Sequence, residues 1–282
     1  MKKHFFLALA LLIGAGTSAL AAGLTAGTPV QVARSANGMM APVWSPDGKQ
    51  IAATGSNYTG IYVFNADGSE MRQLTNLEGA GYKMAWSEDG TEVIGRTNVR
   101  DGVRVLHDTK AWNASNGKVR TIATRQRTNS NPRTGATRVS LLSKMTENAA
   151  GVAATVPALA QYAGKTVINP ALSPDGTMIA FQIVGNGMFV INADGTNLRS
   201  LGAGMHPAWM PDNNTLVYTL VQDNGNTLTG STVMTIALDS NKKEVLMNNS
   251  GLIPMHPAIN ADGTRMAFDN AVDGSIYVVT LK

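Results

Sequence analysis

A short motif that recurs along the chain constrains its fold more than any other feature. Its fullest copy is Trp44-Ser45-Pro46-Asp47-Gly48, and the other copies begin at Trp86, Leu172, Trp209 and Ile259. Allowing for one missing copy between Trp86 and Leu172, the mean spacing is about 43 residues, which is the length of one four-stranded propeller blade. The repeat therefore predicts an all-β propeller.

The first repeat contains all four strands that a blade needs. Four short β-rich runs occupy residues 40–45, 51–54, 61–64 and 71–75. Pro-Asp-Gly follows the first run and Asp-Gly follows the third, as expected for tight turns, because Gly accepts the positive φ that such turns require. Short strands between regular turn signals are typical of a radial blade.

The interval between Trp86 and Leu172 leaves room for about two repeats. We therefore predict a degenerate third blade over about residues 123–164, and a six-bladed propeller in all. The first half of this segment is polar and rich in turn formers. The second half is rich in Ala and could form a short helix broken at Pro157. A five-bladed ring with an insertion is the alternative.

The two ends of the repeat array predict how the ring closes. Residues 29–34 alternate like a strand but belong to no repeat, and the last repeat, from Met255, ends before its fourth strand. We expect the N-terminal strand to complete the last blade. Such closure removes the open sheet edges that would otherwise favour aggregation.

The first residues are typical of a secretory signal peptide. Lys2 and Lys3 precede the apolar run of residues 5–14, and small residues at positions 19 and 21 predict cleavage after Ala21. An uncleaved anchor is the alternative, but the run is shorter than the roughly 20 residues that span a bilayer. We predict a periplasmic or secreted protein in which residues 22–282 form a single propeller domain. No later segment is apolar enough to cross a membrane.

Composition excludes several classes of function. The chain has no Cys, so disulfides, thiol catalysis and thiolate metal sites are excluded. The formal net charge of +4 includes Lys2 and Lys3 of the signal peptide, and no dense run of Lys or Arg follows. A nucleic-acid partner is therefore not expected. A closed ring is complete by itself, so we expect a monomer.

The residues of the first repeat resemble those of a known family. Trp-Ser-Pro-Asp-Gly is followed by Ile-Ala, then by Ile-Tyr-Val with Asn-Ala-Asp-Gly, and then by Leu-Thr. This order is similar to the repeat of TolB-type periplasmic propellers, and the resemblance extends over about 200 residues by the repeat length. It implies the fold but no particular activity, because tricorn-like proteases and oligogalacturonate lyases share the repeat. TolB carries a separate N-terminal domain before its propeller. Here only a few residues separate the predicted signal peptide from the first strand, so we expect a free-standing propeller.

In propellers of this type the first strand of each blade lines the central channel, so the residues just before each motif should lie at one mouth. The position three residues before the motif holds Ala41, Lys83, Asn169, His206 and His256. His206 and His256 belong to consecutive repeats and should stand side by side. We take His206, His256, Lys83 and Asn169 as candidate ligand-binding residues of a channel rim. The alternative is that the two histidines fill equivalent structural positions inherited through duplication of the repeat.

The rim residues allow several chemistries. Histidine can donate a hydrogen bond, transfer a proton or bind a metal near neutral pH. A metal site needs three or four ligands, and two equivalent histidines do not reach that number, so we predict no metal and no other cofactor. We also predict no catalytic residues, because no Gly-x-Ser-x-Gly nucleophile motif is present. The Asp residues of the motif turns are expected to bind their own backbone.

These observations favour a non-catalytic, TolB-like binding scaffold of the cell envelope. Its partner would be an envelope protein or a peptide, and a small ligand is possible at the rim. A loop expected between Arg96 and Thr109, including Arg100 and Arg104, is a natural partner contact. The alternative is an enzyme at the channel mouth, such as a carbohydrate lyase or hydrolase that uses His206 and His256.

Overall fold

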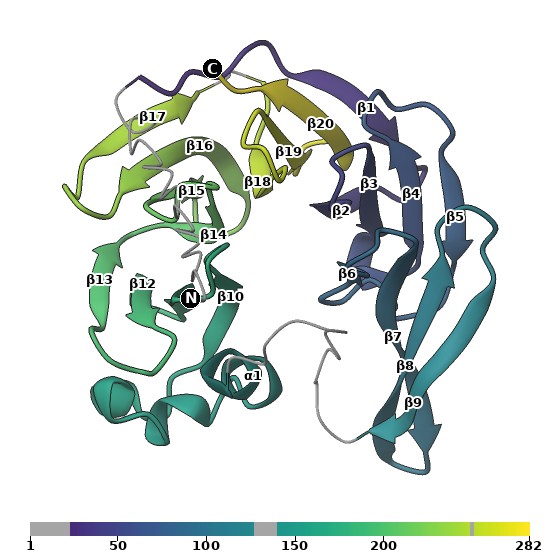
Figure 1. Cartoon of the computed structure of the whole chain (residues 1–282), viewed down its shortest axis with the longest axis horizontal. Coiled ribbons are helices and arrows are strands. Elements are labelled where there is room, and N and C mark those ends of the chain that lie inside the picture. The colour runs from purple at the N-terminus through teal and green to yellow at the C-terminus, as the bar shows by residue number, and fades with distance from the viewer. Residues whose placement is uncertain (1–22, 127–139, 249–250) are drawn as a thin grey trace, which may run out of the picture.

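The computed structural model describes residues 23–126, 140–248 and 251–282, so the predicted signal peptide lies outside the described residues. Within them, five four-stranded antiparallel sheets surround a common axis (Figure 1). We number these sheets as blades I to V. Blade I contains β2 (Met39–Trp44), β3 (Gln50–Gly55), β4 (Ile61–Asn65) and β5 (Arg72–Thr75), with the short helix η1 (Ser56–Tyr58) between β3 and β4. Blade II contains β6 (Ala85–Trp86), β7 (Glu92–Asp101), β8 (Arg104–Asn113) and β9 (Val119–Gln126).

The other three blades follow the same order from the inside outward. Blade III contains β10 (Val167–Leu172), β11 (Met178–Ile183), β12 (Gly187–Asn192) and β13 (Arg199–Gly202). Blade IV contains β14 (Met205–Trp209), β15 (Thr215–Asp223), β16 (Leu228–Ala237) and β17 (Lys243–Met247). Blade V contains β18 (Pro254–Ile259), β19 (Arg265–Asn270), β20 (Ser275–Thr280) and β1 (Val30–Arg34).

The prediction of six blades is wrong, because the described residues form five sheets. Of the segment expected to form a third blade, residues 123–126 end β9, and residues 127–139 lie outside the described residues. Residues 140–162, which we call the helical segment, form α1 (Ser140–Glu147) and the 3₁₀ helices η2 (Val152–Ala154) and η3 (Pro157–Tyr162). Figure 1 shows this segment between blades II and III. The alternative, a five-bladed ring with an insertion, describes the fold.

The helical segment is helical for reasons of local sequence and packing. It is rich in Ala, a strong helix former, and Pro157 starts η3, where its missing N–H costs no hydrogen bond. Its apolar side chains form one core with blade III, in which Met145 and Leu159 are fully buried with Phe181 and Phe189. The segment therefore covers the face of blade III that a neighbouring blade would otherwise cover.

The predicted closure of the ring is confirmed. The N-terminal strand β1 pairs antiparallel with β20, with Val30 opposite Val278 and Arg34 opposite Ser275. Blade V is therefore completed by a strand from the other end of the repeat array.

The motif Trp residues join neighbouring blades. The indole N–H of each donates to a main-chain carbonyl of the preceding blade: Trp44 to Ala258 (2.9 Å), Trp86 to Val43 (3.0 Å) and Trp209 to Ala171 (2.9 Å). Blade III has Leu172 at this position, and its preceding neighbour is the helical segment rather than a blade. The recurring Trp thus acts in packing between blades.

Blade II carries a long projection. Strands β7 and β8 pair over their full length, from Glu92 opposite Asn113 to Asp101 opposite Arg104, so the segment expected to be a loop is a regular hairpin. With the outer strand β9 it forms a three-stranded arm, residues 92–126, that extends away from the ring axis (Figure 1). None of the helices in the described part of the chain combines the length and apolar character needed to cross a membrane.

Candidate functional site

A bulge in the inner strands defines the rim. All five residues at the predicted rim position have a left-handed backbone: Ala41 (φ 51°), Lys83 (φ 53°), Asn169 (φ 51°), His206 (φ 53°) and His256 (φ 45°). In β2, β10, β14 and β18 the register with the second strand shifts at this position. Bulges of this kind redirect a side chain out of the regular ladder. The five positions predicted to be equivalent are therefore equivalent in conformation.

A second set of polar residues, which was not predicted from the sequence, lies against the rim. It occupies the position ten residues after the start of each motif and comprises Thr54, Arg96, Gln182, Thr219 and Asp269. Each follows three apolar or small residues of the second strand, and that single polar interruption was the available signal. Asp269 and Gln182 are each only 5% exposed.

Hydrogen bonds join the two sets within blades III, IV and V. Asn169 Nδ2 donates to Gln182 Oε1 (2.7 Å), His206 Nδ1 lies 3.3 Å from Thr219 Oγ1, and His256 Nδ1 lies 2.9 Å from Asp269 Oδ1. Two further bonds cross between blades. The backbone N–H of His206 donates to Gln182 Oε1 (2.9 Å), and that of Ala41 donates to Asp269 Oδ1 (3.0 Å).

The two histidines are in contact, as the repeat spacing predicts. Their ring centroids are 4.0 Å apart with an angle of 44° between the planes. Burial, and to a smaller extent the neighbouring His256, lowers the pKa of His206 to about 3. His206 is therefore neutral at physiological pH.

The burial of His206 predicts that acid destabilises the folded chain. The pKa of its imidazole is about 3 in the folded chain, against 6.5 when unperturbed, so the unfolded chain binds this proton first. Its contribution to stability is complete above pH 6.5 and is lost as the pH falls towards 3, by about 2 kcal/mol at pH 5. His206→Asn removes the titration and keeps a residue that tolerates positive φ. Urea unfolding at pH 7 and pH 5 should show a smaller acid loss in His206→Asn than in the wild type or in the control His107→Asn. Equal acid losses in all three chains would contradict this assignment.

Lys83 lies apart from the histidines. Its Nζ donates to the Thr146 carbonyl near the end of α1 (3.3 Å) and lies 5.2 Å from the centre of the Tyr82 ring. Burial lowers the pKa of its ammonium, and the nearby Arg96 adds to that effect. A Lys near the C-terminal end of a helix interacts favourably with the helix dipole and the last carbonyls. Lys83 therefore links blade II to the helical segment.

Of the four predicted rim residues, the structure brings His206 and His256 together. Asn169 is connected to them through Gln182, and Lys83 contacts the helical segment. The described residues contain no group of three or more His, Asp or Glu side chains placed to hold a metal ion.

Comparison with known proteins places this ring in a family. The TolB beta propeller domain family matches residues 18–201, well over half of the chain. The chain belongs to this family. No curated protein is significantly similar to it in sequence.

Several solved structures are similar to this TolB-type propeller at low sequence identity. The β-propeller domain of Cps50 (Swd1) from Myceliophteria thermophila is 9% identical, with a TM-score of 0.52 over 90% of this chain and 100% of that one. TolB from Acinetobacter baumannii is 13% identical (TM-score 0.40, 90% of this chain) and the tricorn protease 12% identical (TM-score 0.49, 86% of this chain). The chain spans 57% of the TolB chain and 25% of the tricorn chain.

A cleft adjoins the rim of this TolB-type propeller between blades III and IV. Its volume is about 640 Å³, and its lining includes Ile168, Gln182 and Met205 together with four glycines. Gln182 also accepts the hydrogen bonds from Asn169 and from the His206 backbone. The cleft and the rim therefore share a residue.

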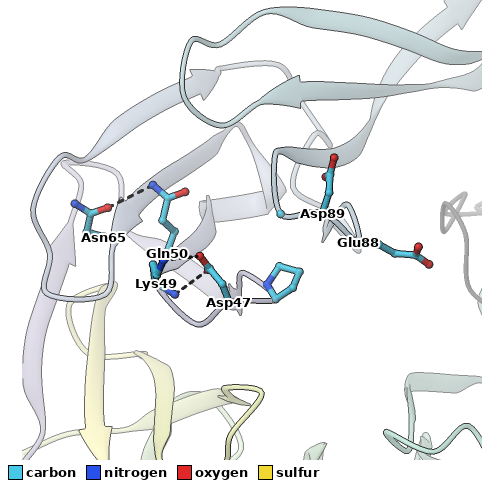
Figure 2. A pocket seen from close by; sticks show the side chains of 8 residues that line it. Asp47, Lys49, Gln50, Asn65, Glu88 and Asp89 are labelled. Carbon is cyan, nitrogen blue, oxygen red and sulfur yellow. Dashed lines mark hydrogen bonds and ion pairs between the residues drawn. The ribbon is translucent and has the colours of Figure 1, made fainter.

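A second pocket, of about 500 Å³, lies between blades I and II at the motif turns (Figure 2). Asp47, Glu88 and Asp89 line it together with Lys49. Asp89 accepts hydrogen bonds from Ser87 and from the Thr91 backbone and hydroxyl, and these bonds lower the pKa of its carboxyl to about 2. Asp47 is bound in the same way by Ser45 and by the Lys49 backbone. The prediction that the motif Asp residues serve their own turns is confirmed.

Proposed function

We propose that this chain is a non-catalytic binding scaffold of the cell envelope, periplasmic or secreted, that recruits an acidic protein partner through the arm of blade II. The observation that carries the proposal is the charge of this arm. Residues 92–126 contain seven Lys and Arg against three Asp and Glu, whereas the rest of the described chain contains eleven against sixteen. A basic projection beside described residues of net negative charge favours and orients an acidic partner.

The surface of the arm supports this proposal. Val103 at its tip is fully exposed and Val105 is 49% exposed. Arg120 pairs with Glu92 and Arg125 with Asp101, but Arg100 and Arg104 form no ion pair with another described residue. Two unpaired guanidinium groups beside exposed apolar side chains provide both charge and area for a protein contact. The signal-like residues 1–21 and the family support a place in the envelope.

Site-specific cross-linking tests the proposal. A photoreactive amino acid placed at Val103 should give one defined adduct with an envelope protein in living cells. The same residue at Val272, which is 62% exposed on blade V, is the matched control and should give none. The double change Arg100→Glu and Arg104→Glu should remove the adduct, whereas Lys165→Glu with Lys282→Glu should not. Equal labelling from both positions, or an adduct that survives charge reversal of the arm, would refute a partner site there.

A second candidate, an enzyme at the channel mouth, is favoured by one observation. Asp269 contacts His256 Nδ1, which is how a carboxylate orients an imidazole that acts as a base. His206 stays neutral at physiological pH and does not supply a positive charge to a substrate. Turnover of an acidic or neutral polysaccharide that is lost in His256→Asn but kept in His107→Asn would favour the enzyme over the scaffold.

A further inference from the structure

The hydrogen bonds of the two rim histidines fix which nitrogen of each carries the proton. Thr219 Oγ1 donates its only proton to the Met205 carbonyl (3.2 Å), so it accepts from His206 Nδ1–H. His256 Nδ1 faces the carboxylate oxygen of Asp269, which accepts only, so this nitrogen also carries a proton. In the neutral imidazoles both Nε2 atoms are therefore acceptors.

These two Nε2 atoms are left without partners among the described residues. Neither Nε2 forms a hydrogen bond with a described residue, and both histidines are only partly buried, with the His256 side chain 25% exposed. The imidazoles that carry them are in ring contact, on adjacent blades at the channel rim. We call His206, His256 and Asp269 the acceptor corner.

The charge around the acceptor corner selects the kind of ligand. Asp269 is nearly buried, and its carboxylate forms no ion pair with a described Lys or Arg. A ligand group that donates no hydrogen bond, such as a carboxylate or a phosphate, would be repelled by the lone pairs of the two Nε2 atoms and by the negative charge of Asp269. A metal ion would find two nitrogens but no third ligand group among the described residues. A ligand group that donates several hydrogen bonds and carries a positive charge matches both the two acceptor nitrogens and the negative charge of Asp269.

We propose that the acceptor corner binds a primary ammonium group, with His206 Nε2 and His256 Nε2 each accepting one N–H. Asp269 acts as a positioning residue: its carboxylate holds the His256 tautomer and provides negative charge behind it. The described residues outside the arm include sixteen Asp and Glu against eleven Lys and Arg, and this net negative charge attracts such a cation. The ammonium comes from a Lys side chain or from the amino terminus of a peptide. This site does not depend on the arm or its partner.

Nitrogen NMR of the imidazoles tests the proposal at pH 7.5, on the chain from residue 22 to 282. Long-range proton–nitrogen spectra of the free protein should show the Nδ1–H tautomer for both His206 and His256. Nα-acetyl-lysinamide should then shift both Nε2 signals in a saturable way, while its uncharged norleucine analogue should not. Alaninamide, which carries only an α-ammonium, distinguishes the two sources of the group, and saturable binding of either amine supports the site.

Variants separate recognition from stability. Asp269→Asn keeps an acceptor for Ala41 and His256 but removes the charge, and should weaken binding of the lysine probe by about tenfold. His107→Asn, on the arm, should bind as the wild type does. The proposal would be overturned if the spectra showed Nε2–H tautomers, or if the norleucine analogue bound as well as the lysine probe. It would also be overturned if Asp269→Asn bound the lysine probe as tightly as the wild type, or if Zn²⁺ shifted the Nε2 signals and neither amine did. If the lysine probe binds but the arm gives no cross-linked adduct, the acceptor corner is supported and the partner site on the arm is refuted. If the arm gives its adduct but the probe does not bind, the partner site is supported and the acceptor corner is refuted.

Discussion

Replacing Leu159 by Ala is expected to lower the free energy of unfolding by about 3 kcal/mol, because a fully buried Leu loses its contacts and leaves a cavity. Leu159 is 0% exposed and lies in the core that the helical segment shares with blade III. If this segment replaces a blade, its core residue should be as costly to truncate as a residue of a β-sheet. Urea unfolding followed by far-ultraviolet circular dichroism and by tryptophan fluorescence measures the change.

The matched control is Val103→Ala at the tip of the arm, where the side chain is fully exposed and the change should cost almost nothing. Met145→Ala on α1 should behave like Leu159→Ala, since Met145 belongs to the same core. A loss below about 1 kcal/mol for both core variants, or a separate early transition that leaves the sheets intact, would show that the helical segment is an appendage rather than part of the ring.

Replacing Asp269 by Ala is expected to cost about 3 kcal/mol, because two donors lose their acceptor in a nearly buried place. The Ala41 N–H on blade I and His256 Nδ1 on blade V both bind Asp269 Oδ1. The bond from Ala41 joins the last blade to the first at the seam of the ring, and the bond from His256 lies within blade V. Chemical denaturation at pH 7.5 measures the loss.

Asp269→Asn distinguishes the hydrogen bonds from the charge. The amide oxygen still accepts from Ala41, so this variant should lose about 1 kcal/mol only. Asp67→Ala, in an exposed turn where the carboxylate binds Ser69, serves as the control and should be the mildest of the three. Equal and small losses for Asp269→Ala and Asp269→Asn would mean that the seam does not depend on this carboxylate.

The sequence predicts the five blades that carry the motif, the closing strand and the contact between His206 and His256, because all three follow from the spacing of a repeated unit. It wrongly adds a sixth blade between Trp86 and Leu172. A repeat places equivalent residues at equivalent positions, including the left-handed bulge that carries both histidines. The helical segment was harder to assign. No second copy of it exists in the chain, and its burial depends on tertiary contact with Phe181 and Phe189 rather than on local pattern.

The rim was predictable only in part, because its partners lie on a different strand. Asp269 and Gln182 follow Ala-Phe in β19 and β11, where they look like the ends of buried runs. Their proximity to His256 and Asn169 depends on the bulge, which shifts the register of the inner strand. Counting ten residues forward from each motif would have found them. The role of Lys83 could not be found in this way, because its partner belongs to the helical segment.

The tryptophan bonds between blades bear on how the molecule as a whole deforms. Indole-to-carbonyl bonds join blade V to I, I to II and III to IV, and the Ser231 hydroxyl joins IV to V by donating to the Pro254 carbonyl. Among the described residues, the passage from II to III runs instead through the helical segment and its hydrogen bond from Lys83. The annulus is therefore mechanically uneven and comparable to a split ring. Thermal breathing should concentrate at this one joint, widening or narrowing the central opening while the remaining sheets move as a stiff arc.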